Sequence, residues 1–70
     1  MAEVLAPLAG KILAVLVEPG AKVEEDDELV VIEALKMENT VYAPNAGTVK
    51  EIKVKVGDSV ADEDLLLVLE

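Results

Sequence analysis

The sequence contains no cysteine, histidine, arginine, tryptophan or phenylalanine. Without cysteine the chain forms neither disulfides nor thiolate metal sites, and without histidine it lacks a common zinc ligand and the usual general base. The single serine, Ser59, therefore has no histidine to activate it as a nucleophile. These absences argue against a metal site and against an enzyme that works on its own.

Positive charge is also scarce, because six lysines stand against fifteen carboxylates and the formal net charge is -9. Nucleic acids and anionic membrane surfaces bind basic patches, so neither is expected as a partner. No apolar run approaches the roughly 18 residues that a membrane span requires, and the N-terminus lacks the features of a signal peptide. We therefore expect no direct membrane insertion and a cytoplasmic location.

A length of 70 residues allows one domain, residues 1–70, with a modest core. Hydrophobic residues make up 53% of the chain, and Tyr42 is the only aromatic one. The core must be packed from aliphatic side chains, many of them β-branched. Such side chains fit the pleated surface of a sheet, so the composition favours strands over helices.

The chain contains two copies of one pattern. Residues 6–33 align with residues 43–70 at an offset of 37 without a gap, and eleven of the twenty-eight positions are identical. Gly10 with Gly47 is one identical pair. Two copies are too few for a solenoid, so we expect two halves packed face to face about a pseudo-twofold axis.

Each half is predicted to form about four short strands. Ile52, Val54 and Val56 alternate with lysines, which is typical of a strand with one wet face. The consecutive polar residues Lys50 and Glu51, between Val49 and Ile52, predict that this strand bulges or bends there. The expected fold class is all-β, a flattened barrel or sandwich of two four-stranded antiparallel sheets.

The segment "ALKMENTVY", residues 34–42, lies between the two copies. It places Lys36 in the hairpin that joins the halves, at the end of the domain opposite the chain termini. Leu35 and Met37 beside it are of a type common in cores. In a two-residue turn Leu35 and Lys36 would both need positive φ, which costs about 1 to 3 kcal/mol per residue and persists mainly at functional sites. A looser turn is the alternative.

The stretch "EALKMEN", with "AP.AG" before and after it, resembles the biotinyl (biotin carboxyl carrier) domains of biotin-dependent carboxylases and decarboxylases, whose signature is E-A-M-K-M. The similarity covers the whole chain. It implies a flattened β-barrel with biotin attached through an amide to Lys36 by biotin protein ligase. The implied partners are biotin carboxylase and carboxyltransferase domains or subunits, in the cytoplasm or on a membrane-bound decarboxylase complex. The domain itself would catalyse nothing.

Five further residues around Lys36 are candidate contacts of the cofactor or ligase: Glu33, Ala34, Leu35, Met37 and Glu38. Leu35 departs from the family pattern, which has methionine there. Glu33 matches Glu70 in the repeat, and Glu70 has no modified lysine near it. A structural role for Glu33 is therefore favoured. Glu38 has no counterpart in the repeat, which supports a ligase contact. Met37 either caps the barrel end or contacts several partners.

The family often has glycine in the loop before the last strand of each half, where this chain has Asp26 and Glu63. We therefore expect these loops to take a different turn. The carboxylates of the loops lack the spacing of a calcium-binding loop, so they are interpreted as solvated.

Two other functions remain open. A lipoyl domain of a 2-oxoacid dehydrogenase-type complex also carries its cofactor on a hairpin lysine, but typically has aspartate before that lysine and a small residue after it. An unmodified interaction module would use the barrel only as a docking surface.

The two copies differ in polarity at four aligned positions. The second copy has Asn45, Lys50, Glu51 and Lys53, whereas the first has Leu8, Leu13, Ala14 and Leu16. An apolar surface in one half where the other is wet predicts docking on another domain or subunit.

Overall fold

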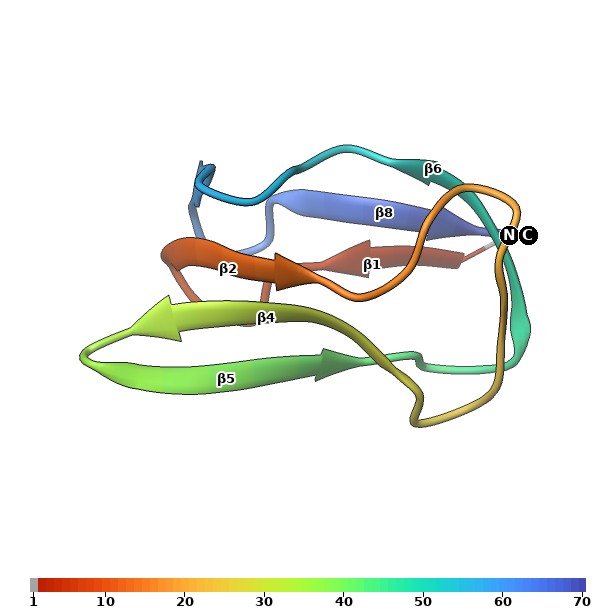
Figure 1. Cartoon of the computed structure of the whole chain (residues 1–70), viewed down its shortest axis with the longest axis horizontal. Helices are drawn as coiled ribbons and strands as arrows, with labels where there is room; N and C mark the ends of the chain where they lie inside the picture. The colour runs from red at the N-terminus through yellow and green to blue at the C-terminus, as the bar shows by residue number, and fades with distance from the viewer. Residues whose placement is uncertain (1) are drawn as a thin grey trace.

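The computed structural model describes residues 2–70, which form two four-stranded antiparallel sheets packed face to face (Figure 1). The strands are β1 (Ala2–Leu5), β2 (Gly10–Val15), β3 (Lys22–Val23), β4 (Glu28–Ala34), β5 (Met37–Tyr42), β6 (Gly47–Ile52), β7 (Ser59–Val60) and β8 (Leu65–Leu69). The predicted all-β fold class is confirmed. Residues 2–70 contain no helix of a length and apolarity that could cross a membrane.

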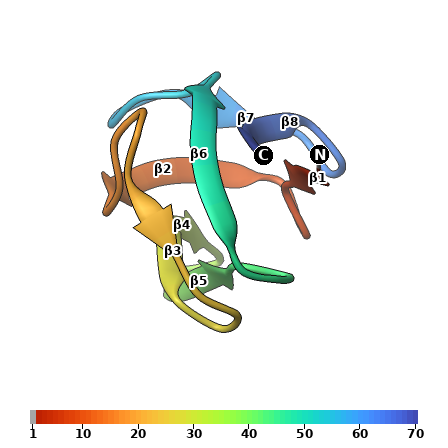
Figure 2. The same cartoon turned by 90° about the vertical axis from the view of Figure 1, so that its right-hand side faces the viewer.

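The two halves of the chain are interleaved. One sheet has the strand order β1-β8-β6-β3 and the other β5-β4-β2-β7, so each sheet takes two strands from each half. The expectation of one sheet per half is therefore wrong. The cause is that β1 and β3 of the first half pair with β8 and β6, whereas β5 and β7 of the second half pair with β4 and β2. Figure 2 shows β3 lying beside β6.

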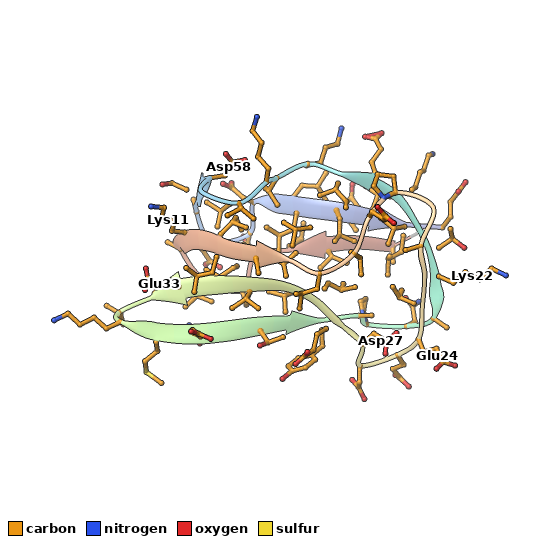
Figure 3. All side chains as sticks on the ribbon, in the orientation of Figure 1. Lys11, Lys22, Glu24, Asp27, Glu33 and Asp58 are labelled. Carbon is orange, nitrogen blue, oxygen red and sulfur yellow. The ribbon has the colours of Figure 1, made fainter. Side chains whose placement is uncertain are left out.

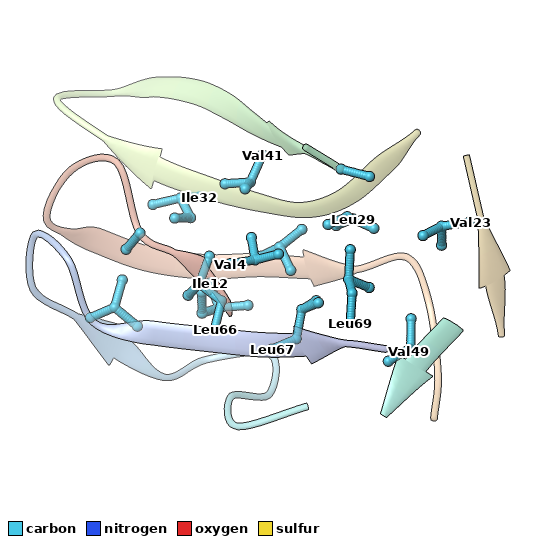
Figure 4. Close-up of a cluster of buried hydrophobic side chains, with 14 residues drawn as sticks. Val4, Ile12, Val23, Leu29, Ile32, Val41, Val49, Leu66, Leu67 and Leu69 are labelled. Carbon is cyan, nitrogen blue, oxygen red and sulfur yellow. The ribbon is translucent and has the colours of Figure 1, made fainter. Parts of the chain in front are cut away.

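The core is wholly aliphatic and lies between the sheets (Figure 4). Its largest fully buried side chains are Ile12, Leu29, Val30, Ile32, Val49, Leu66, Leu67 and Leu69. Each such side chain contributes about 1.5 to 3 kcal/mol by leaving water. No polar or charged side chain in residues 2–70 is buried, so the chemistry of this domain has to lie on its surface.

The repeat in the sequence is matched by a repeat in the backbone. A Cβ atom at Gly10 would lie 2.5 Å from the carbonyl oxygen of Glu33, and one at Gly47 would lie 2.7 Å from that of Glu70. Glycine therefore occurs at the same place in both copies because two strands approach too closely for any side chain.

The acidic loops correct one expectation from the sequence. Asp26 and Glu63 have φ values of 72° and 70°, which is the conformation that glycine favours. The expected change of turn is therefore not required, because Asp26 and Glu63 themselves adopt the positive φ that glycine would have at these positions. Each loop is closed by one aspartate, and the backbone N–H of Glu24 donates to Asp27 Oδ2 at 2.8 Å. In the second copy the N–H of Ala61 donates to Asp64 Oδ2 at the same distance.

The strand around Lys50 was predicted only in part. The register of β6 against β8 shifts between Val49 and Glu51, so the predicted bulge is confirmed. However, β6 ends at Ile52, and Val56 lies in a turn with 64% of its surface exposed. The alternating pattern beyond Ile52 marks side chains that still reach the core, as Val54 does, after regular pairing has stopped.

The start of β1 and the end of β8 lie at one end of the molecule, and the hairpin between β4 and β5 lies at the other (Figure 1). The domain measures 30 × 19 × 17 Å, and the hairpin projects along the longest direction. The predicted separation of Lys36 from the termini is confirmed.

Candidate functional site

The candidate site is the two-residue hairpin that joins β4 to β5. Ala34 pairs with Met37, which leaves Leu35 and Lys36 as the central residues of the turn. Their φ values are 54° and 65°, so both lie in the left-handed region that a type I′ turn requires. The tight turn predicted from the sequence is confirmed, and the looser alternative is not formed.

The backbone of this turn is unfavourable for the residues that occupy it. Asn-Gly and Asp-Gly fill such turns readily, whereas leucine and lysine pay for contact between Cβ and the following carbonyl. The conformation persists because a long register holds β4 against β5 on one side, from Ala34 with Met37 back to Glu28 with Tyr42. Strain of this kind concentrates at functional positions.

Three neighbouring side chains are presented to solvent at the tip. Leu35 is 94% exposed and Met37 is 65% exposed, and Lys36 between them is exposed as well. Leu35 and Met37 therefore do not lie in the core, although their apolar side chains favoured that position. Met37 does not cap the barrel end. Large apolar side chains left in water beside an amine form a surface suited to contact with another protein.

The ammonium group of Lys36 is unrestrained. Within residues 2–70 no hydrogen bond or ion pair holds its Nζ atom, whereas Lys53, just after β6, forms a salt bridge with Glu51. The Asn39 side chain instead supports the hairpin, since its Nδ2 donates to the Met37 carbonyl oxygen at 3.4 Å. Sequence reasoning did not single out Asn39, and its signal was no more than a polar residue two positions after Met37.

The two glutamates near the hairpin face each other. Glu33 on β4 and Glu38 on β5 are directly paired, and both side chains are exposed. Lys11 on β2 is the cross-strand neighbour of Glu33 on its other side, and Figure 3 shows Lys11 and Glu33 at the same end of the domain. Ala34, the remaining candidate, is half-buried and closes the turn with Met37.

A carboxyl group with a shifted pKa lies outside this hairpin, on β6. The pKa of the Glu51 carboxyl is lowered, chiefly because the Lys53 side chain hydrogen-bonds to it and adds a positive charge nearby. No group of three or more acidic side chains in residues 2–70 is arranged to hold a metal ion. What the hairpin offers chemically is a primary amine at the tip of a rigid support.

Comparison with known proteins agrees with this description. The sequence model of a family described as "Biotin-requiring enzyme", the biotin and lipoyl attachment domain, matches residues 2–69. The chain therefore belongs to this family. The family description implies biotin as the cofactor.

Similar proteins include carboxylase and decarboxylase subunits. The chain is 55% identical over 38 residues to the glutaconyl-CoA decarboxylase subunit gamma of Acidaminococcus fermentans, which covers 54% of this chain and 26% of the relative. It is 43% identical over 37 residues to the 2-oxoglutarate carboxylase large subunit of Hydrogenobacter thermophilus, covering 53% of this chain and 6% of the relative. The matched segment is thus a small part of these longer proteins.

Solved structures share the fold over the full chain. The urea carboxylase of Kluyveromyces lactis superposes with a TM-score of 0.93 and 32% identity, covering 99% of this chain and 6% of that one. The lipoyl domain of the 2-oxoglutarate dehydrogenase complex from Azotobacter superposes with a TM-score of 0.84 and 29% identity, covering 100% of this chain and 96% of that one. The fold is therefore shared by part of a carboxylase and by a lipoyl domain.

Proposed function

We propose that this domain is a biotin carrier and that Lys36 is the residue to which biotin is attached. The observation that carries the proposal is the placement of one unrestrained lysine at the centre of a tight, strained hairpin, at the end of the domain remote from the chain termini. No other lysine of residues 2–70 lies in a strained turn.

The chain's own contribution to the attachment is an accessible nucleophile. Attack on an activated carboxyl carbon needs the lone pair of the lysine nitrogen, so the ligase must remove a proton from the ammonium group first. The new bond is an amide between Nζ and that carbon, and the activating group leaves with the bonding electrons. Exposure of the tip lets a ligase enclose Lys36, Leu35 and Met37 together.

Biotin attached to Lys36 would carry a carboxyl group from a biotin carboxylase site to a carboxyltransferase site. For this task the domain provides position: a long arm on a rigid barrel keeps the cofactor at high local concentration near both sites. We include in this proposal that the domain serves a carboxylase or a decarboxylase, because the similar proteins are subunits of such enzymes.

The proposal is tested by incubating the chain with biotin protein ligase, biotin and ATP, and measuring intact mass. We expect the mass of one biotinyl group to be added, and peptide mapping to place it on Lys36. Lys36→Arg, which keeps the charge and the length of the side chain, should add none. Incorporation at another lysine, or into the Lys36→Arg protein, would contradict the proposal.

A lipoyl carrier is the second candidate, because the superposition on a lipoyl domain covers the full length of both chains. Incubation with lipoate ligase and lipoate in place of biotin separates the two. We expect little or no lipoyl addition, since exposed Leu35 and Met37 flank the lysine. Failure of Lys36 to accept either group would favour the unmodified interaction module.

A further inference from the structure

We propose that the outer face of the β5-β4-β2-β7 sheet docks a protein surface that carries an apolar strip bordered by lysine or arginine side chains. This interaction does not involve the hairpin lysine and goes beyond the proposed carrier function.

The centre of this face is defined by strand register and burial. Val30 and Ile32 on β4 are fully buried, so Val31 between them points outward. Val31 is paired with Ala14 on β2 and with Thr40 on β5. Paired residues of antiparallel strands share a face, so these three side chains lie in one row across the sheet.

Two larger side chains lie two residues beyond this row, one after Thr40 and one after Ala14. Tyr42 on β5 follows the buried Val41 and is 52% exposed, and Leu16, just after β2, is 49% exposed. Leu13 lies at the bulge of β2 and is half-buried. We call the set Leu13, Ala14, Leu16, Val31 and Tyr42 the apolar strip. Leu8, which the sequence grouped with these residues, lies in the loop after β1, outside the sheet.

The fold itself does not require this strip. The equivalents of Leu13, Ala14 and Leu16 in the second copy are Lys50, Glu51 and Lys53, which are all exposed on or just after β6 of the other sheet. There Lys53 Nζ lies 2.6 Å from Glu51 Oε2. The sheet that contains β6 thus has charged side chains at these outer positions, whereas the sheet that contains β2 has apolar side chains at the equivalent positions.

The charges around the strip indicate the chemistry of its partner. Glu28 is paired with Tyr42, and Glu33 is paired with Glu38, so three exposed carboxylates lie on this face. Lys11 is the single lysine among the paired residues of the sheet. A second copy of the chain would bring these carboxylates against their own kind, which disfavours a dimer. A partner with basic side chains around an apolar strip is complementary in both respects.

The test uses the Lys36→Arg chain, so that no biotin enters, labelled with nitrogen-15 for NMR titration. The probe is a synthetic amphipathic helix with leucines on one face and lysines on both flanks, and the comparison probe has glutamate in place of lysine. We expect the lysine peptide to shift the amide signals of the apolar strip and the glutamate peptide to shift none.

Two double variants then localise the contact. Leu16→Lys with Tyr42→Lys should weaken binding by about tenfold or more, because it puts charges into the strip. Leu5→Lys with Val56→Lys adds the same charge at exposed apolar positions outside the strip, and should change affinity by no more than about twofold. The spectra of the free variants verify that each is folded.

Three outcomes would overturn the proposal. Equal weakening by both variants, with shifts centred on the acidic loops at 24–27 and 62–64, would mean non-specific attraction to negative charge. If the lysine peptide did not bind, the proposed partner, an apolar strip bordered by basic side chains, would be wrong. Sedimentation that showed a dimer abolished by Leu16→Lys and Tyr42→Lys would make a second copy the occupant. Biotin loading of Lys36 is independent of all three results.

Discussion

Glu33 and Glu38 stand directly opposite each other across the β4–β5 hairpin, three and two residues from Lys36. Like charges in opposed positions are destabilising, and cross-strand pairs contribute about 0.2 to 1 kcal/mol. We therefore expect Glu38→Gln to raise the free energy of unfolding by about that amount in urea denaturation at low salt. Glu38 is the better choice for substitution because Glu33 also has Lys11 as a neighbour.

Glu3→Gln is the matched control, since Glu3 is paired with the uncharged Val68. It should leave stability within about 0.5 kcal/mol of the starting value. Equal effects of the two substitutions would show that only net charge matters. If Glu38 also contacts biotin protein ligase, loading of Lys36 should slow in Glu38→Gln and not in Glu3→Gln.

Leu35→Asn should make the domain more stable. Leu35 has a φ of 54° and is 94% exposed, so asparagine relieves backbone strain and gives up almost no burial. A gain of about 1 kcal/mol corresponds to a rise of roughly 4 to 8 °C in the melting temperature of a domain this small. Thermal unfolding followed by circular dichroism measures it.

Leu35→Ala is the control for this prediction, because alanine shortens the side chain without favouring positive φ. It should give no gain in melting temperature. We also expect slower biotin loading in Leu35→Asn, since the apolar contact to the ligase is lost. A more stable variant that loads at the unchanged rate would mean that Leu35 has no role in recognition.

Gly10→Ala should be much more disruptive than Gly20→Ala. A Cβ atom at Gly10 meets the Glu33 carbonyl oxygen at 2.5 Å and Ile32 Cγ2 at 2.6 Å. Such overpacking costs about 1 to 3 kcal/mol or more. At Gly20 the space is open and only the φ of 91° opposes a side chain, at a cost of about 1 to 2 kcal/mol. Urea denaturation ranks the two variants, and the reverse order would contradict the close approach of β2 to β4.

Glu63→Gly should stabilise the second acidic loop. Its φ of 70° favours glycine, and the relief of strain should exceed the added freedom of the unfolded chain by about 0.5 to 1 kcal/mol. Asp62→Gly is the control, because Asp62 is not among the residues with positive φ. It should destabilise by about 0.5 to 1 kcal/mol, through the unfolded state alone. The pair is compared by thermal unfolding.

The Glu51–Lys53 pair predicts a dependence on pH. The pKa of Glu51 is lowered in the folded state, mainly by Lys53. The stabilisation from this pair is therefore present above the pKa of the unfolded chain and is lost as pH falls through the lower pKa of the folded state. Lys53→Met should raise the Glu51 pKa, as measured by carbon-13 NMR of the carboxyl group. Lys55→Met is the control and should leave that pKa nearly unchanged.

Local features of this protein were predictable from the sequence, and long-range pairing was not. The bulge at Lys50 and the turn at Leu35–Lys36 depend on neighbouring residues, and the structure confirms both. The pairing of β1, β3, β5 and β7 with strands of the other half was missed because alternation of apolar and polar residues is the same whichever sheet a strand joins. Exposure of Met37 was missed because its side chain alone favours burial.

The interleaving of the two halves bears on how such a chain could have arisen. Since each sheet draws half of its strands from each copy, a single copy on its own would leave both sheets incomplete and the aliphatic core open to water. An ancestor of half the present length could have buried that core only as a symmetric pair of chains. Duplication and fusion of the gene would then have turned one symmetric junction into the hairpin of Lys36 and left the other unjoined, between the start of β1 and the end of β8.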